Sequence, residues 1–169
     1  MNELNLMDAT SFKNQTYLKY SNWMKIVLRR AKEVGEKEIP ITALIIDKKG
    51  RCIGRGSNDR HKKNNPLGHA ELVALRQASY IKNDWRFNDC TMVVNLEPCT
   101  MCAAALIQSR IGKVVFATED KKRGGLGGSI DLANHESAHH KMIIIKGILE
   151  EESKYIIQKW FKKLRSEIK

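Results

Sequence analysis

Two short stretches decide the fold and the chemistry of this chain: His69-Ala70-Glu71 and, farther along, Pro98-Cys99-Thr100-Met101-Cys102. One imidazole and two thiolates are typical zinc ligands, and three protein ligands leave a fourth position open for water, as in catalytic zinc sites. Glu71 stands two residues from the histidine, where a carboxylate can transfer protons. The two stretches therefore predict a catalytic zinc centre with its own general acid/base.

Helices and strands are expected to alternate around these stretches. The expected helices cover 17–34, 69–81, 98–109 and 150–168, and the expected strands cover 41–46, 51–56, 91–96, 113–117 and 142–146. A short turn joins the first two strands, which are therefore antiparallel, whereas the later crossovers through helices are parallel. This order predicts the α/β class: a three-layer α/β/α sandwich with a mixed five-stranded sheet covered on both faces.

The predicted zinc ligands fall at the starts of two expected helices. A helix N-terminus carries partial positive charge, which lowers the pKa of a thiol and favours the thiolate that zinc needs. Cys99 and Cys102 are three residues apart and so project from one face of a helical turn. Pro98 suits the first turn of that helix, where its missing N–H is no loss.

The length of 169 residues fits one domain with one sizeable core, so a single domain that contains the zinc centre is expected over 1–169. Residues 1–14 are expected to be a loosely ordered N-terminal extension, and they lack the basic start and apolar run of a secretory signal. No stretch of eighteen or more apolar residues occurs, so no membrane span is expected.

The formal net charge is +11, which favours a polyanionic partner such as nucleic acid. Four cysteines are present, and the two outside the motif, Cys52 and Cys90, are expected to be buried thiols. No disulfide framework is indicated. Thiolates kept free for a metal imply a reducing compartment, so a cytoplasmic protein is expected.

The motif H-x-E…P-C-x-x-C is the signature of zinc-dependent nucleobase deaminases. The residues around it extend the likeness, over Gly54-Arg55-Gly56-Ser57-Asn58, 69–77, 96–102 and 110–116. In these stretches the chain resembles the bacterial tRNA adenosine deaminases, members of the cytidine-deaminase-like superfamily, which convert the wobble adenosine of an anticodon to inosine. The resemblance covers most of the chain, from about Ser21 to the C-terminus.

The resemblance implies a cytidine-deaminase-like fold and hydrolytic removal of the adenine amine as ammonia. It implies one Zn²⁺ per chain held by His69, Cys99 and Cys102, with Glu71 as the proton shuttle.

It further implies that Asn58 and the backbone of Ala70 recognise the base, and that Asp120 lies against the sugar-phosphate chain beside the target nucleotide. The family forms homodimers, and the tRNA anticodon stem-loop lies across both subunits.

Two other functions fit parts of the pattern. A deaminase of a free base or nucleoside, of the guanine or cytosine type, would use the same zinc chemistry, but a small neutral substrate does not need the strong positive charge. A non-catalytic nucleic-acid-binding module with a structural zinc would need a fourth ligand, for which His135, His139 and His140 are the candidates. Such a site has no use for Glu71.

Two segments stay open to two interpretations. Asp120-Lys121-Lys122-Arg123 precedes the glycine-rich stretch 124–129, and together they either hold phosphates or form a solvated loop. The expected C-terminal helix carries a basic set that either contacts nucleic acid or is a solvated face. This set consists of Lys159, Lys162, Lys163 and Arg165.

Overall fold

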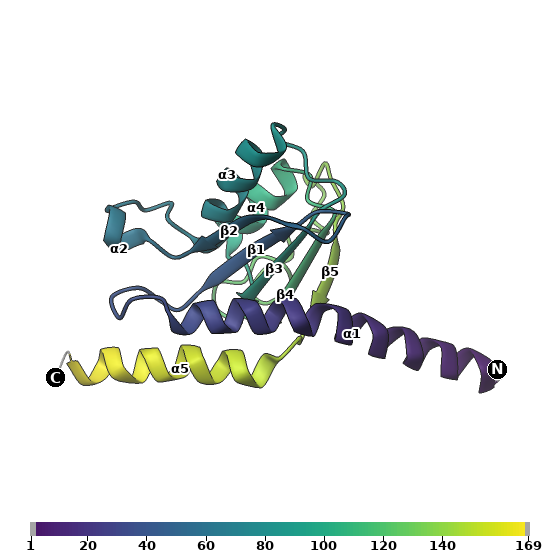
Figure 1. Cartoon of the computed structure of the whole chain (residues 1–169), viewed down its shortest axis with the longest axis horizontal. Coiled ribbons are helices and arrows are strands. Elements are labelled where there is room, and N and C mark those ends of the chain that lie inside the picture. Colours follow the sequence, from purple (N-terminus) through teal and green to yellow (C-terminus); the bar gives the residue numbers. More distant parts are fainter. Residues whose placement is uncertain (1–2, 168–169) are drawn as a thin grey trace.

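The computed structural model describes residues 3–167, with side chains from residue 15 onward. The helices are α1 Glu3–Lys32, α2 Arg60–Lys63, α3 Ala70–Lys82, α4 Thr100–Gln108 and α5 Glu150–Glu167. The strands are β1 Thr42–Ile46, β2 Cys52–Ser57, β3 Thr91–Leu96, β4 Lys113–Thr118 and β5 Ile143–Lys146. Figure 1 shows the strands between two helical layers.

The five strands form one mixed sheet in the order β2-β1-β3-β4-β5. Strand β1 pairs antiparallel with both β2 and β3, whereas β3, β4 and β5 are parallel to one another. Every residue of β1 is buried, and so is most of β3 and β4, as apolar runs covered on both faces should be. The predicted mixed five-stranded sheet is confirmed.

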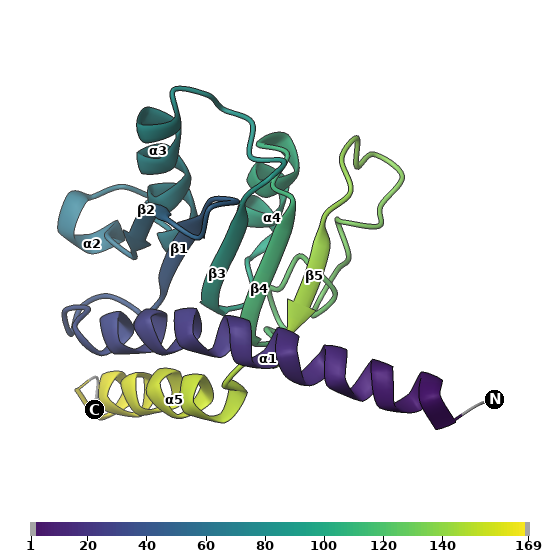
Figure 2. The same ribbon diagram turned by 45° about the vertical axis from the view of Figure 1, so that its right-hand side comes forward.

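Helices cover both faces of the sheet, so there are two cores. On one face α3 and α4 pack over side chains that include Met92 and Val94. On the other, α1 and α5 pack over side chains that include Val93. Successive residues of β3 point to opposite faces, which is why neighbours in sequence belong to different cores. Figure 2 shows the two pairs of helices on either side of the sheet, and the predicted three-layer sandwich is confirmed.

Three predicted boundaries were wrong. Helix α1 begins at Glu3 rather than at residue 17, so residues 3–14, expected to be a loose extension, are helical; no glycine or proline interrupts the first 34 residues. Between β2 and α3, where no helix was expected, residues 60–63 form the short helix α2. Helix α4 begins at Thr100, because Cys99 is the extended N-cap residue, so Pro98 precedes the helix rather than sitting in its first turn.

One predicted thiol environment was also wrong. Cys90 is buried as expected, but Cys52 is exposed because it begins β2, an edge strand of the sheet. Among the described helices, none is both long and apolar enough to cross a membrane.

Two glycines of β2 let α3 lie unusually close to the sheet. A Cβ atom on Gly56 would come within 2.0 Å of the Ala70 carbonyl oxygen, and one on Gly54 within 2.4 Å of the Ala74 carbonyl oxygen. Because glycine has no Cβ, the helix backbone can approach the strand directly. This contact sets the N-terminus of α3 beside the end of β2, where the functional residues gather.

Candidate active site

Two helix starts bring the three predicted zinc ligands together. His69 is the N-cap residue of α3, Cys99 is the N-cap residue of α4, and Cys102 lies in the first turn of α4. Their ligand atoms all lie within 4.8 Å of one another. The imidazole Nδ1 atom of His69 is 3.6 Å from the Sγ atom of Cys99 and 3.5 Å from that of Cys102.

These separations fit a tetrahedral zinc ion. Typical Zn–S and Zn–N bonds of about 2.3 and 2.1 Å, set at tetrahedral angles, place sulfur and nitrogen about 3.6 Å apart. The distances from the His69 nitrogen to the two sulfurs match that value. Nδ1 is therefore the nitrogen that meets a metal, which leaves Nε2 to carry the proton of the neutral ring.

The electrostatics of the cluster favour an anionic thiolate. A hydrogen bond from Cys102, supported by His69, lowers the pKa of Cys99 to about 4. The same shared hydrogen bond and burial raise the pKa of Cys102, and the hydrogen bond to Cys99 raises the pKa of His69. Cys99 therefore favours the ionised form, whereas Cys102 and His69 retain their protons. A metal cation that binds these groups displaces such protons, as is usual for thiol and imidazole ligands.

Glu71 lies in the first turn of α3 and is only 4% exposed. Burial raises the pKa of its carboxyl group to about 7. The neighbouring ligands His69 and Cys102 act in the opposite direction and lower the pKa of this carboxyl group. A carboxyl group that gains and loses a proton near neutral pH, beside the ligands, is suited to general acid/base catalysis.

The two residues expected to recognise the base contact each other. The backbone N–H of Ala70 donates to the side-chain oxygen of Asn58 at 3.3 Å, and both residues are buried. Asn58 follows β2 directly and is held there by its own N–H, which donates to the Ile41 carbonyl at 3.1 Å. Since the Asn58 oxygen already accepts from Ala70, its amide N–H group is the donor that the side chain can offer a base.

Asp120 organises a tight turn. One of its carboxylate oxygens accepts the backbone N–H groups of Lys122 and Arg123, at 3.0 and 3.1 Å, and its carbonyl accepts that of Gly124 at 2.8 Å. The turn leaves Lys121, Lys122 and Arg123 exposed. This is an Asx turn, in which an aspartate side chain accepts hydrogen bonds from backbone N–H groups two or three residues later in the sequence.

The glycine-rich stretch does not offer free N–H groups for phosphates. The N–H groups of Gly124, Gly125 and Gly127 donate to the carbonyls of Asp120, Pro98 and Ile130. The N–H group of Gly128 donates to the carboxylate of Glu97 at 2.8 Å. These donors are used within the protein, so the glycine N–H groups are not free to hold phosphates, and only the basic side chains before them could do so.

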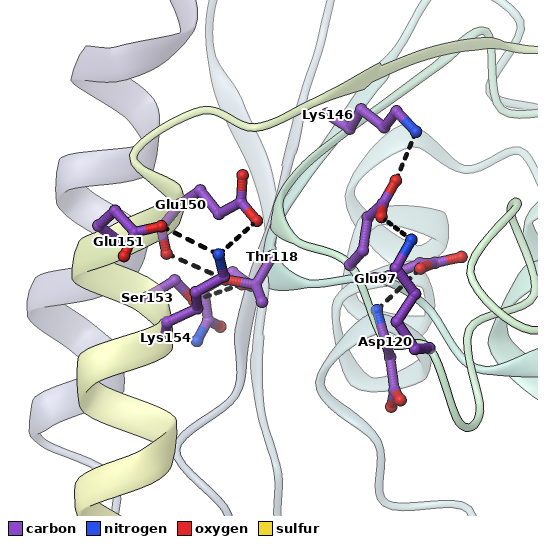
Figure 3. Close-up of polar contacts among 11 residues, drawn as sticks. Glu97, Thr118, Asp120, Lys146, Glu150, Glu151, Ser153 and Lys154 are labelled. Atoms are coloured by element: carbon purple, nitrogen blue, oxygen red, sulfur yellow. Dashed lines mark hydrogen bonds and ion pairs between the residues drawn. The ribbon is translucent and has the colours of Figure 1, made fainter.

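Glu97 was missed as a site residue. Its side chain is 2% exposed and accepts three backbone N–H groups from the segment after β4, including that of Asp120 (Figure 3). The signal in the sequence was an ionisable residue directly after a buried strand and just before Pro98-Cys99. A buried carboxylate requires such partners.

A cleft beside the cluster was also missed. A cavity of about 890 Å³ opens next to Asn58, between the end of α1, strand β2 and helix α2. Its lining is mostly charged and includes Arg30, Arg55 and Lys62. The backbone N–H of Lys62 donates to Glu38 at 2.9 Å, which holds α2 against the segment between α1 and β1. Helix α2 was not predicted, because its segment is polar throughout and has no helical hydrophobic pattern.

A fourth protein ligand is not found among the described residues. The three histidines considered for that role are absent from the cluster of His69 and the two cysteines. The ring of His140 instead contacts the Ile111 carbonyl oxygen at 2.8 Å, and that of His135 contacts Ser137. The donor set is that of an open site, which favours catalysis over a structural role.

Only some of the apolar side chains of helix α5 are buried against the protein. Ile156 and Ile157 are buried, whereas Phe161 is 39% exposed and meets Trp160 edge to face, with ring centroids 5.0 Å apart. The Trp160 ring N–H donates to the Glu36 carbonyl at 2.7 Å, and Lys163 pairs with the Glu36 carboxylate. Part of the basic face thus has acidic partners on the protein itself.

Comparison with known proteins agrees with this geometry. The family model for the cytidine and deoxycytidylate deaminase zinc-binding region matches residues 18–118. The tRNA-specific adenosine deaminase of Bacillus subtilis is 36% identical over 148 residues, covering 87% of this chain and 91% of that protein. That of Aquifex aeolicus is 37% identical over 147 residues, covering 86% and 96%.

Solved structures show the same fold. A structure from biochemical and structural studies of A-to-I editing by tRNA:A34 deaminases at the wobble position of transfer RNA superposes with a TM-score of 0.76. It is 32% identical, and the match covers 80% of this chain and 98% of that one. The guanine deaminase of Nitrosomonas europaea, at 19% identity and a TM-score of 0.62, shares the fold.

Proposed function

The chain belongs to the tRNA-specific adenosine deaminases, and we propose that it hydrolyses the wobble adenosine of a tRNA anticodon to inosine and ammonia. The resemblance inferred from the sequence is confirmed by relatives that match over most of their length. The observation that carries the proposal is the cluster of His69, Cys99 and Cys102 with buried Glu71 beside it. That set combines an open metal site with a proton carrier, which is what hydrolytic deamination requires.

The proposed chemistry divides between the metal and one carboxyl group. His69, Cys99 and Cys102 would hold a zinc ion, which would lower the pKa of a water molecule enough to supply a nucleophile near neutral pH. Glu71 accepts a proton from the attacking water and delivers it to a ring nitrogen of adenine. The water oxygen forms a bond to the carbon that carries the amine. Glu71 then accepts the remaining proton of that oxygen, now a hydroxyl group on the carbon, and delivers it to the amine. The carbon–oxygen double bond of inosine forms as the carbon–nitrogen bond breaks, and ammonia departs.

Asn58, Ala70 and Asp120 are proposed to hold the nucleotide. The contact between Asn58 and Ala70 puts one amide donor and the start of α3 at the same place, beside the zinc ligands. Asp120 lies on the segment that follows β4 and is proposed to lie along the ribose-phosphate chain. An anticodon loop suits such a site, because its unpaired bases can be turned out at low cost.

The assembly and the location of the enzyme are inferred from the same relationship. We infer a single deaminase domain over 1–169 that works as a cytoplasmic homodimer and binds RNA. The one continuous sheet supports the single domain, the net charge of +11 supports RNA binding, and free thiolate ligands suit a reducing compartment. A dimer would run in light scattering at twice the 19.3 kDa of one chain, and a monomer mass would contradict it.

The test is incubation of zinc-loaded protein with an anticodon stem-loop that carries adenosine at the wobble position. Mass spectrometry should detect inosine in the RNA, and none when guanosine replaces that adenosine. Free guanine, adenosine and cytidine are incubated in parallel. Product from a free base or nucleoside with none from RNA would overturn the substrate, and leave the alternative of a small-molecule deaminase.

A further inference from the structure

We propose that Glu97 is a positioning residue: its carboxylate anchors the segment 120–128 to the start of α4, and so presents an RNA-binding edge beside the zinc ligands. The inference rests on the proposed function, since it assigns to this edge the role of holding the RNA backbone. It concerns a side chain that takes no part in the proton transfers.

The anchor consists of three hydrogen bonds. One carboxylate oxygen of Glu97 accepts the backbone N–H groups of Leu126 and Gly128, at 2.9 and 2.8 Å. The other oxygen accepts the N–H group of Asp120 at 2.9 Å (Figure 3). Hydrogen bonds to a charged acceptor are stronger than neutral ones, and here they hold both ends of the segment at one point.

The segment is shaped to fit this carboxylate. A Cβ atom on Gly124 would lie 2.3 Å from the carboxyl carbon of Glu97, and one on Gly128 would lie 2.3 Å from a carboxylate oxygen. Both glycines are thus required by close approach to the side chain. Two glycines and three backbone N–H donors thus surround the buried carboxylate of Glu97. The need for close approach to Glu97 explains why glycine occurs at these two positions, and no bound phosphate is required.

The same segment contacts the start of α4, the helix that carries the metal ligands. The Gly125 N–H donates to the Pro98 carbonyl at 2.9 Å, and Gly124 forms a β-bridge with Cys99. A Cβ atom on Gly125 would lie 2.9 Å from the Cα atom of Thr100, the first residue of α4. Glu97 therefore sets the distance between the zinc ligands and the segment.

The anchored turn presents positive charge to solvent. Asp120 is fixed through its N–H by Glu97, and its carboxylate in turn fixes the N–H groups of Lys122 and Arg123. The side chains of Lys122 and Arg123 are exposed, as is that of Lys121. A cationic edge held in place next to the site reduces the ordering cost of binding a phosphate backbone.

The decisive variant is Glu97→Gln, which keeps the size of the side chain. Its remaining oxygen can accept from Leu126 and Gly128, but its amide N–H group then faces the N–H of Asp120, which loses its partner. We expect the KM for the anticodon stem-loop to rise about tenfold, with kcat at saturation and zinc content within about twofold of wild type. Hydrogen–deuterium exchange should accelerate at 120–123.

Two further variants complete the design. Glu136→Gln makes the same change of charge at an exposed position of the same long connection between β4 and β5, and should leave KM and exchange unchanged. Gly124→Ala places a methyl group against the carboxylate of Glu97 and so disturbs the same contact without changing any charge. It should raise KM as Glu97→Gln does. It supplies the test if Glu97→Gln does not fold.

A merely structural role would give a different result. Losses of kcat and zinc content with an unchanged KM, or unchanged exchange at 120–123 with wild-type RNA affinity, would overturn the proposal. If instead the proposed deaminase function were wrong, the wild-type protein itself would form no inosine, so the two failures can be told apart. In that case, RNA affinity measured by fluorescence anisotropy with wild type and Glu97→Gln still decides the role of Glu97.

Discussion

Glu71 and the zinc ligands illustrate how neighbouring side chains define one another's chemistry. Glu71 is buried at the start of α3, and that burial keeps its carboxyl group close to the balance between its protonated and ionised forms. The thiol of Cys99 ionises more readily than a free thiol, because a hydrogen bond from Cys102 and the nearby His69 ring stabilise its thiolate. Two acidic groups of one site thus differ in their readiness to lose a proton, which suits them to the separate functions proposed, proton carrier for Glu71 and metal ligand for Cys99.

Replacement of Glu71 by glutamine should separate chemistry from metal binding. Glu71→Gln keeps the shape but cannot carry a proton, so kcat should fall by about 10²–10⁴-fold, the usual contribution of general acid/base catalysis. Zinc measured by mass spectrometry should stay near one per chain, since the three ligands are untouched. Undiminished turnover in the zinc-loaded variant would contradict the assigned role.

Removal of the metal should abolish turnover and lower the melting temperature. Dialysis against a chelator leaves two thiols, an imidazole and a buried carboxyl group in close proximity without a central cation. Metal that binds the folded state alone stabilises it by mass action. Calorimetry of zinc-loaded and metal-free protein measures the shift, and the variant Cys99→Ser should resemble metal-free protein even with added zinc. An active metal-free enzyme would rule out a zinc mechanism.

Among the elements, the pair β2 and α3 sets the site. Gly54 and Gly56 let the helix lie directly on the strand, and the end of β2 then places Asn58 beside the first residues of α3.

On the other face of the sheet, two hydroxyl groups fix α5 in place. Thr118 donates to the Glu150 carbonyl at 3.2 Å, and buried Ser153 donates to the Asn95 carbonyl (Figure 3).

Gly56→Ala should therefore destabilise the protein and weaken metal binding. The added Cβ atom would overlap the Ala70 carbonyl, so α3 must move away from β2 and carry His69 with it. Overpacking of this kind costs about 1–3 kcal/mol, and more where backbone blocks the new atom. Urea denaturation measures the loss. Gly35→Ala is the matched control, since a Cβ atom there meets nothing within 4 Å and the stability should stay within about 0.5 kcal/mol.

For the molecule as a whole, the net positive charge is the property that bears on the proposed binding of RNA. The chain carries 30 lysines and arginines against 19 acidic residues. Some of the cations are neutralised within the protein, as where Lys163 meets Glu36 and Lys146 meets Glu119. Lys121 shares Glu119 with Lys146, whereas Lys122 and Arg123 stay exposed on the same turn, next to the bridge between Cys99 and Gly124. The excess is thus partly concentrated at the edge of the site.

RNA binding should weaken steeply as salt is added. Each phosphate contact releases condensed counterions, so the logarithm of the binding constant falls with the logarithm of salt concentration, by about 0.7–0.9 per contact. Fluorescence anisotropy with a labelled anticodon stem-loop over a salt series measures the slope. Charge reversal at Lys122 should reduce it by about one contact. A binding constant independent of salt would contradict an electrostatic RNA surface.

The sequence by itself determined the class of fold and the metal centre. Hydrophobic periodicity is local, so β3 was predicted at its observed bounds and most other elements within a few residues. The ligands His69, Cys99 and Cys102 were recognisable because metal coordination restricts both residue type and spacing. Glu71 stood out for the same reason, as a carboxylate at a fixed distance from a ligand.

Only the tertiary structure decided which polar groups have partners. The glycine-rich stretch was compatible with phosphate binding until its N–H groups were seen to donate to Glu97 and to nearby carbonyls. The exposure of Cys52 follows from the place of β2 at the edge of the sheet. Hydrogen bonds between segments far apart in sequence depend on where the whole chain brings them, and no local pattern encodes that. This is why the zinc ligands could be read from the sequence, whereas the anchoring role of Glu97 could not.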